Sequence, residues 1–210
     1  MQRRCVIISA YNTSSVRESI RLRDDDFVLC ADGGYALAMR EGVRPDLLIG
    51  DFDSMAAPEN PVCKIVRLPM HKDDTDTMAC VRYAIDQGFA EIAIVGGIGG
   101  RFDHSIASVQ TLAYAHSQGA DAALLDGDTT AFFIENAART VACVPGRKLS
   151  VFAYTETCTG VTLRGVEYPL TDAVLTQNYP IGVSNEFCGE AARISVKRGT
   201  LLIVASKERL

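Results

Sequence analysis

The sequence lacks the features of membrane, disulfide-rich and nucleic-acid-binding proteins. No apolar run approaches the roughly 18 residues of a membrane span, and the first apolar stretch is too short for a secretory signal. The seven cysteines form an odd, scattered set without a C-x-x-C pair, which excludes a disulfide framework or a zinc site. Basic residues are in deficit, 21 Lys and Arg against 26 Asp and Glu, so the broad positive field of a nucleic-acid-binding protein is missing. We therefore expect a cytoplasmic protein with no nucleic-acid and no membrane partner.

The first two thirds of the chain alternate short apolar runs with segments of helical period. The apolar stripe of Met78, Val81 and Ile85 predicts a helix that ends near Gly88, and a second stripe predicts a helix that ends near Gly119. This alternation is typical of an α/β domain with a mostly parallel sheet and helices on its faces. We expect buried strands at residues 6–8, 27–31, 47–49, 65–68, 92–95 and 122–125.

The pattern changes near residue 137. Beyond it there is little helical period, and glycine or proline recurs about every ten residues. Short apolar runs at 149–152, 161–163, 194–196 and 201–204 predict strands of a β-sandwich or open barrel. With 210 residues, 48% of them hydrophobic, the chain can bury two such cores. We predict an α/β domain with a mostly parallel sheet over residues 1–137, followed by an all-β sandwich over residues 138–210.

Negative charge is concentrated between residues 46 and 76, where seven acidic residues stand against three basic ones. Four aspartates follow predicted strands: Asp32, Asp51, Asp53 and Asp76. Because the carboxyl ends of the strands form the ligand crevice of an open α/β sheet, we expect these side chains to meet there. Clustered carboxylates repel each other unless a cation joins them, and oxygen ligands without a thiolate or imidazole cluster indicate Mg²⁺.

Aspartates at such positions also have a second interpretation. Asp is common in turns and at helix N-termini, where its side chain accepts backbone hydrogen bonds. For Asp73 and Asp74 this is the better interpretation, because a helix is predicted to begin just after them.

A glycine-rich segment, Gly-Gly-Ile-Gly-Gly-Arg, follows the predicted strand at 92–95 and precedes a predicted helix. Its glycines, including Gly97, Gly99 and Gly100, allow backbone amides to approach phosphate oxygens, and Arg101 can hold a phosphate with two donors. The segment is neither a dinucleotide fingerprint nor a Walker loop, and a tight strand–helix turn explains it equally well. Since no nucleophilic Ser or Cys arrangement occurs, the residues favour direct phosphoryl-type transfer.

Six motifs in this order resemble the thiamine pyrophosphokinase (thiamine diphosphokinase) family, over nearly the whole chain. Four lie in the α/β part: Cys-Ala-Asp-Gly-Gly at 30–34, Pro-Asp-Leu-Leu-Ile-Gly-Asp-Phe-Asp-Ser at 45–54, Lys-Asp-Asp-Thr-Asp-Thr at 72–77 and Gly-Gly-Ile-Gly-Gly-Arg-Phe-Asp-His at 96–104. Two lie in the β-rich part: Gly-Val-Thr-Leu-Arg-Gly-Val-Glu-Tyr-Pro-Leu at 160–170 and Gly-Val-Ser-Asn-Glu-Phe at 182–187.

The resemblance implies transfer of a pyrophosphoryl group from ATP to the primary hydroxyl of thiamine, with release of AMP. It implies that members are homodimers, with each active site between the α/β domain of one subunit and the β-sandwich of the other. It also implies residue roles: Asp51, Asp53 and Asp76 hold Mg²⁺; Asp32 lies near the same ion or the phosphates; Thr75, Arg101 and Asp103 position ATP; Ser184 and Asn185 lie by the thiamine pyrimidine. Among the catalytic aspartates Asp51, Asp53, Asp73 and Asp76, either Asp73 or Asp76 is the candidate to accept the hydroxyl proton.

The segment after the first predicted strand departs from this family. Members often have glycines there, whereas this chain has Ser-Ala-Tyr-Asn-Thr at 9–13, so Tyr11 can change the shape of the pocket. Two other functions stay open. One is another transferase, either a pterin pyrophosphokinase or an enzyme that uses Asp51-x-Asp53 as the metal motif for a nucleotide-sugar donor. The other is a non-catalytic thiamine or nucleotide sensor.

Overall fold

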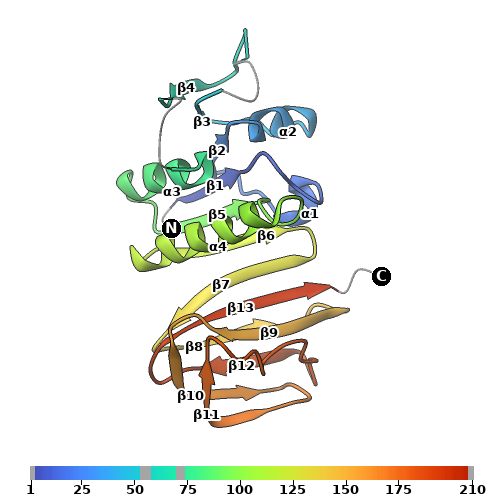
Figure 1. Ribbon diagram of the computed structural model, residues 1–210. Coiled ribbons are helices and arrows are strands. Elements are labelled where there is room, and N and C mark those ends of the chain that lie inside the picture. The colour runs from blue at the N-terminus through green and yellow to red at the C-terminus, as the bar shows by residue number, and fades with distance from the viewer. Residues whose placement is uncertain (1–2, 53–57, 70–73, 208–210) are drawn as a thin grey trace. The chain divides into compact units, whose positions relative to one another are not determined.

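The computed structural model describes residues 3–52, 58–69 and 74–207 (Figure 1). The chain divides into two compact units, Met1–Gly127 and Asp128–Leu210. The first unit alternates strands with helices, and the second is built from antiparallel strands. In the described part of the chain, no helix is long and apolar enough to cross a membrane.

The first unit contains parallel strands in the order β4-β3-β2-β1-β5-β6. They are β1 (Arg4–Ile8), β2 (Phe27–Ala31), β3 (Leu47–Gly50), β4 (Lys64–Arg67), β5 (Glu91–Val95) and β6 (Asp121–Asp126), which confirms the strands predicted for this part. The order runs outward from β1 through β2 to β4 on one side, and through β5 to β6 on the other. The sheet therefore has a topological switch point between β1 and β5, the place where open α/β sheets bind ligands.

Helices connect these strands: α1 (Val16–Ser19), α2 (Gly34–Arg40), α3 (Asp76–Asp86) and α4 (Phe102–Ser117). The two longer helices, α3 and α4, are the two helices predicted from the apolar stripes. Helices α2 and α1 were not predicted, although α1 starts with a full capping box between Ser15 and Glu18. With four residues α1 is too short to show a helical period.

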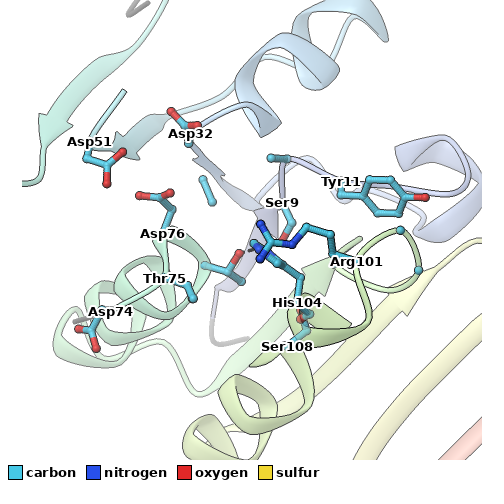
Figure 2. Close-up of a pocket in the computed structure, with 16 residues that line it drawn as sticks. Ser9, Tyr11, Asp32, Asp51, Asp74, Thr75, Asp76, Arg101, His104 and Ser108 are labelled. Atoms are coloured by element: carbon cyan, nitrogen blue, oxygen red, sulfur yellow. Dashed lines mark hydrogen bonds between the residues drawn. The ribbon is translucent and has the colours of Figure 1, made fainter. Parts of the chain in front are cut away.

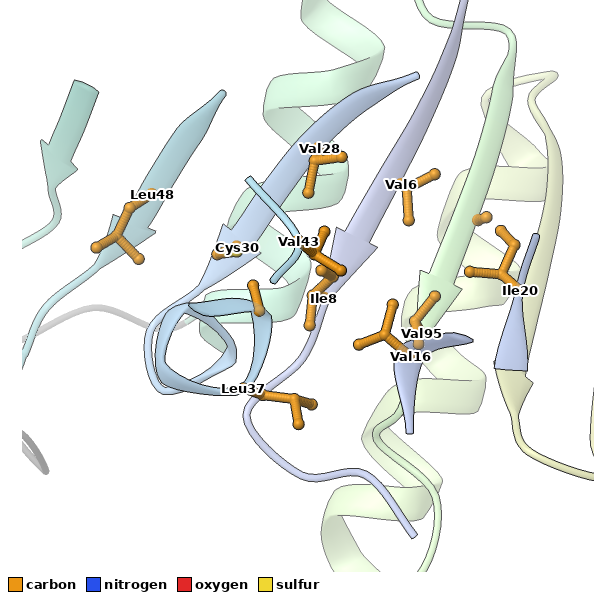
Figure 3. Packing of buried hydrophobic residues seen from close by; sticks show 12 residues of the cluster. Val6, Ile8, Val16, Ile20, Val28, Cys30, Leu37, Val43, Leu48 and Val95 are labelled. Carbon is orange, nitrogen blue, oxygen red and sulfur yellow. The ribbon is translucent and has the colours of Figure 1, made fainter. Parts of the chain in front are cut away.

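Apolar side chains on one face of this sheet pack against α1 and α2 (Figure 3). Val6 and Ile8 of β1 alternate with Cys5 and Ile7, so they point to the same face, and all four are fully buried. Each such aliphatic side chain contributes about 1.5–3 kcal/mol when it leaves water. The cluster on this face comprises Val6, Ile8, Val16, Ile20, Val28, Cys30, Leu37, Ala38, Val43, Leu48, Ala93 and Val95. It holds the strands in register and thereby fixes the positions of the loops at their carboxyl ends.

The second unit has two sets of antiparallel strands, in the orders β7-β13-β9 and β11-β10-β12-β8. They are β7 (Thr129–Glu135), β8 (Ala138–Ala142), β9 (Arg147–Ala153), β10 (Thr157–Arg164), β11 (Leu170–Thr176), β12 (Ala191–Ser195) and β13 (Thr200–Lys207). This confirms an antiparallel β unit without a helix in its described residues, 128–207. The sandwich arrangement stays a prediction.

The two units meet in sequence after Gly127, whereas the change in sequence pattern comes near residue 137. Strand β7 lies between these two points and is apolar and buried from Ala131 to Ile134. The division of the chain into functional domains at 1–137 and 138–210 stays a prediction.

Candidate active site

A cavity of about 840 Å³ opens at the carboxyl ends of β1, β2, β3 and β5, beside the switch point (Figure 2). Four loops and the start of α3 contribute to its wall. These are residues 9–11 after β1, Asp32 after β2, Asp51 after β3, residues 74–77, and parts of the segment 97–108 after β5. The cavity is therefore built from segments that are far apart in the sequence and that parallel strands bring to one edge.

Asp32 and Asp51 follow directly after two neighbouring strands. Asp32 has a positive φ of 41°, its N–H donates to the Ile49 carbonyl (2.8 Å), and it is 7% exposed. A Cβ at Gly50 would lie 3.1 Å from both Cα and Oδ1 of Asp32, so a glycine before Asp51 allows the two strand ends to approach closely. Backbone constraints on both sides thus fix the place of the Asp32 carboxylate in the cavity wall.

Asp76 belongs to the first turn of α3. Thr75 is the N-cap of this helix, and its hydroxyl accepts the Met78 N–H at 3.2 Å. An acidic side chain in the first turn is favourable because the helix N-terminus carries partial positive charge. In the next position, the Thr77 hydroxyl lies 3.2 Å from the Ser9 hydroxyl, which ties the start of α3 to the loop after β1. The local role of Thr75 as a cap is compatible with an additional contact to phosphate.

The carboxylates of Asp51 and Asp76 point toward one another across the cavity, with Asp32 close by (Figure 2). Over residues 3–52, 58–69 and 74–207, no three His, Cys, Asp or Glu side chains form a group that could hold a metal ion by themselves. Mg²⁺ is typically bound by one or two carboxylates together with waters and substrate phosphates, so a pair of facing carboxylates fits this ion. Asp53 and Asp73 lie outside the described residues.

The glycine-rich loop after β5 is packed against the loop after β1. The Gly97 N–H donates to the Tyr11 carbonyl at 2.6 Å, and the Gly99 N–H donates to the Ser105 hydroxyl at 3.0 Å. Gly97 has a φ of 82°, and a Cβ there would lie 2.6 Å from the Ser108 hydroxyl. The position thus requires glycine both for its backbone conformation and for the space that α4 leaves.

A comparison of Gly97→Ala with Gly119→Ala separates the requirement for a positive φ from the requirement for space. Gly119 has nearly the same φ, 83°, but no atom lies within 4 Å of an added Cβ. Both variants are expected to lose about 1–2 kcal/mol of stability from the positive φ, as thermal unfolding would show. Only Gly97→Ala should also weaken the binding of magnesium tripolyphosphate, several-fold, because its methyl group displaces the loop that lines the cavity. Equal binding of this phosphate ligand by the two variants would contradict the role of this loop.

Arg101 lines the cavity at the start of α4, and Asp103 holds it. The Arg101 Nε and Nη2 donate to Asp103 at 3.1 and 2.6 Å, and the Asp103 Oδ1 also accepts the His104 N–H at 3.0 Å. The hydrogen bond from Arg101 lowers the pKa of Asp103, so this carboxylate stays ionised. Asp103 is not part of the cavity wall. It orients the guanidinium, which leaves Arg101 as the group that can reach an anion in the cavity.

Two family models match the sequence. The thiamin pyrophosphokinase catalytic domain matches residues 21–124, and the thiamin pyrophosphokinase vitamin B1 binding domain matches residues 138–201. The chain belongs to the thiamine pyrophosphokinase family. This confirms the resemblance read from the six motifs and the prediction that the protein is an enzyme of this class.

Individual relatives support the assignment over most of the chain. A thiamine pyrophosphokinase from Bacillus subtilis is 24% identical over 183 residues, which is 84% of this chain and 86% of that protein. A crystal structure of the Bacillus subtilis enzyme has the same fold, with a TM-score of 0.85 at 21% identity over 99% of this chain and 100% of the other. A thiamin pyrophosphokinase family protein from Enterococcus faecalis is 27% identical, with a TM-score of 0.83 over 98% of this chain and all of that one.

Ser184 and Asn185, the predicted substrate-binding pair, lie in the second unit within the part that the vitamin B1 binding domain model matches. Ser184 is exposed, has a φ of 58°, and donates its N–H to the Ser150 hydroxyl at 3.0 Å. Asn185 is 5% exposed; its amide bonds both the N–H (2.9 Å) and the carbonyl (2.7 Å) of Tyr168. Asn185 therefore fixes the backbone of this segment, and Ser184 is the member of the pair whose hydroxyl a ligand can reach.

None of the seven cysteines, all of which the structure describes, lines the cavity, and none of them forms a disulfide. Burial raises the pKa of Cys5 to about 12 and also raises the pKa of Cys30, so these two thiols are protonated at neutral pH.

Eight of the predicted site residues line the cavity: Asp32, Asp51, Thr75, Asp76, Gly97, Gly99, Gly100 and Arg101. The other lining residues are Ser9, Ala10, Tyr11, Ala31, Asp74, Thr77, His104 and Ser108. Of these, residues 9–11 were noted in the sequence only as part of a segment that departs from the family, and Asp74 only as a residue of a turn or helix N-terminus. The rule that located the aspartates, the carboxyl end of a strand, would also have selected Ser9 and Tyr11 after β1.

Proposed function

We propose that the protein transfers a pyrophosphoryl group from ATP to the hydroxyl of thiamine and releases thiamine diphosphate and AMP. One observation carries this proposal: the carboxylates of Asp32, Asp51 and Asp76 share a single cavity with the glycine loop and Arg101, at the switch point of the sheet. Such a cavity is complementary to a triphosphate with its bound cation. The carboxylates can bind the cation, and the glycine loop and Arg101 can donate to phosphate oxygens.

Mg²⁺ is the ion that these oxygen ligands fit, with Asp51 and Asp76 as its proposed ligands together with Asp53. When bound, the ion supplies neutralisation of charge on the oxygens of the transferring group. The net charge of −5 makes this requirement stronger, because bare carboxylates would repel ATP.

The residues of the chain orient the reaction. Arg101, held by Asp103, pairs with phosphate oxygens; the Thr75 hydroxyl and the N-terminal amides of α3 lie where they can do the same. This orientation places the thiamine hydroxyl in line with the β-phosphorus, so that AMP is the leaving group. A carboxylate oxygen of Asp76 or Asp73 accepts the hydroxyl proton.

The thiamine side of the site is proposed from the family resemblance. Ser184 and Asn185 lie by the thiamine pyrimidine. They belong to the β-rich domain, which folds as an all-β sandwich. The active site forms in a homodimer, between the α/β domain of one subunit and the β-rich domain of the other. An acidic site also suits the thiazolium cation of the acceptor. The proposed location is the cytoplasm.

The direct test is to incubate the protein with MgATP and thiamine and to measure AMP and thiamine diphosphate together. We expect the two products in equal amounts, and neither of them without thiamine or after chelation of the metal. AMP formed only with a pterin acceptor would indicate the pterin-type transferase. Binding of thiamine or ATP with no product would indicate a sensor instead of an enzyme.

A further inference from the structure

Tyr11 places an aromatic ring in the wall of the nucleotide cavity. It is the one Phe, Tyr or Trp side chain that lines this cavity among the residues described, and it is 48% exposed. Tyr11 is therefore an aromatic group that a ligand in this cavity can reach.

One face of the ring is already covered. A Cβ at Gly100 would lie 2.8, 3.0 and 3.2 Å from Cζ, Cε2 and Cε1 of Tyr11, and these near-equal distances place it over the ring face. A Cβ at Gly99 would meet the Cε1 at 3.4 Å. The ring therefore packs on the bare backbone of the glycine loop, and its exposed surface belongs to the cavity wall.

The loop that carries Tyr11 is held by hydrogen bonds at Tyr11 itself and two residues after it. The Tyr11 carbonyl accepts the Gly97 N–H at 2.6 Å. Two residues on, the Thr13 N–H and hydroxyl donate to Asp126 Oδ1 at 3.0 and 2.8 Å, and Asp126 is 1% exposed. A ring that is fixed before the ligand arrives loses little conformational entropy on binding.

The position of the ring matches the nucleoside part of ATP. In Figure 2, Arg101 lies between Tyr11 and the facing carboxylates of Asp51 and Asp76. A triphosphate that reaches from these carboxylates past Arg101 directs its nucleoside toward Tyr11. We infer that the exposed face of the Tyr11 ring stacks on the nucleobase of ATP and makes the site select a nucleoside triphosphate over a bare polyphosphate. This inference rests on the proposed function.

The test compares two ligands, MgATP and magnesium tripolyphosphate, by calorimetric titration in the absence of thiamine. Tyr11→Leu keeps an apolar side chain on the glycine loop but removes the π face, and Tyr11→Phe keeps the face. If the base stacks on the ring, Tyr11→Leu should weaken the binding of MgATP roughly 5- to 100-fold and change the affinity for tripolyphosphate less than about twofold. Tyr11→Phe should stay close to the wild type for both ligands. Phe102→Leu is the matched control: Phe102 is 78% exposed but does not line the cavity, so the ratio of the two affinities should not change.

Other results would overturn the inference. Equal loss of both ligands in Tyr11→Leu would mean that the ring only supports the glycine loop. A rise in the KM for thiamine with unchanged MgATP binding would mean that the ring faces the second substrate. The wild-type enzyme assay for AMP keeps the two proposals apart, because its failure removes the proposed function, whereas unselective loss in Tyr11→Leu removes this inference alone.

Discussion

Replacing Asp51 by asparagine is expected to lower turnover about 100-fold or more while the fold is retained. Asparagine keeps the shape of the side chain but removes the charge that faces Asp76 in the cavity. Charge stabilisation through a bound cation contributes several kcal/mol to the transition state, and each 1.4 kcal/mol corresponds to about tenfold in rate. The measurement is the initial rate of AMP formation at saturating MgATP and thiamine, together with the thermal unfolding midpoint.

The matched control for this experiment is Asp86→Asn. Asp86 is an exposed aspartate at the last position of α3, away from the cavity, so its loss changes the net charge equally without touching the site. If Asp51→Asn turned over at close to the wild-type rate, the proposed metal role of this carboxylate would have to be abandoned. A similar loss in Asp86→Asn would show that net charge, not the site, is responsible.

Replacing Asp26 by alanine is expected to lower the free energy of unfolding by about 3–5 kcal/mol. The Asp26 carboxylate accepts Nε and Nη2 of Arg4 at 2.9 and 2.6 Å, and the Arg23 N–H at 2.7 Å. Its side chain is 1% exposed and that of Arg4 is 10% exposed. Removing the acid leaves a buried guanidinium without its counter-charge at the start of the central strand β1. Urea unfolding at neutral pH measures the loss.

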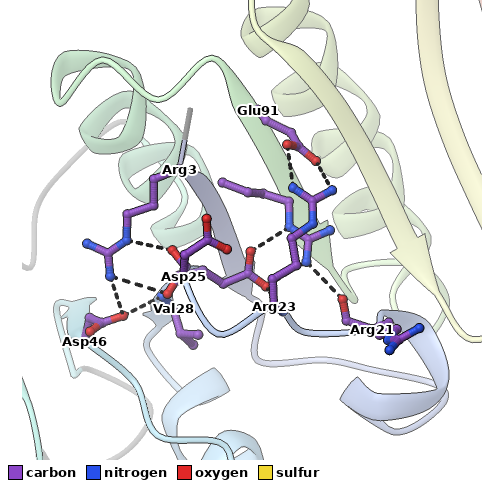
Figure 4. A network of polar contacts seen from close by, with 9 residues as sticks. Arg3, Arg21, Arg23, Asp25, Val28, Asp46 and Glu91 are labelled. Atoms are coloured by element: carbon purple, nitrogen blue, oxygen red, sulfur yellow. Dashed lines mark hydrogen bonds and ion pairs between the residues drawn. The ribbon is translucent and has the colours of Figure 1, made fainter. Parts of the chain in front are cut away.

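A neighbouring ion pair provides the control. Arg23 pairs with Glu91 through two hydrogen bonds of 2.8 and 2.9 Å (Figure 4), but these side chains are 43% and 38% exposed. Because solvent screens exposed pairs, Glu91→Ala should cost at most about 1 kcal/mol. Equal losses for the two variants would show that burial does not decide the strength of these contacts.

The Arg4–Asp26 pair also predicts how the stability difference between the wild type and Asp26→Ala depends on pH. Burial raises the pKa of Asp26, but hydrogen bonds from Arg4 and Arg23 outweigh it, so the pKa is lowered overall. A lowered pKa in the folded state stabilises the protein above the unfolded value of about 3.9, and this contribution is lost as the pH falls toward the folded value. The stability gap between wild type and Asp26→Ala should therefore be constant near neutrality and shrink below about pH 4.

Local sequence patterns predicted the strands of the first unit and its two longer helices, but they missed β7 although its residues from Ala131 to Ile134 are buried. The strands of the first unit and helices α3 and α4 have apolar residues at the spacing of their own secondary structure, which any single stretch of chain reveals. The strands that escaped prediction include β8 and β11, which are the two edges of their sheet. Most of their residues are exposed or only partly buried, so no apolar run marks them.

Some residues of the candidate site were likewise predictable from local sequence, and others were not. The aspartates and the glycine loop were predictable because charge at strand ends and clustered glycines are visible in the sequence itself. Ser9 and Tyr11 were identified only as a departure from the family. Ser9 contacts Thr77, 68 positions further along the chain, and Tyr11 contacts the glycine loop, which is more distant still. No local sequence pattern indicates contacts over such separations.

The sequence by itself determined the strands and the two longer helices of the α/β unit, the acidic and glycine-rich segments, and membership of the family. The tertiary structure decided the strand order β4-β3-β2-β1-β5-β6, and with it which loops share the cavity. The physical reason is that hydrophobic period specifies which residues are buried but not which strand lies next to which. That choice depends on the packing of helices across the sheet, and here it places the Tyr11 ring against the glycine loop.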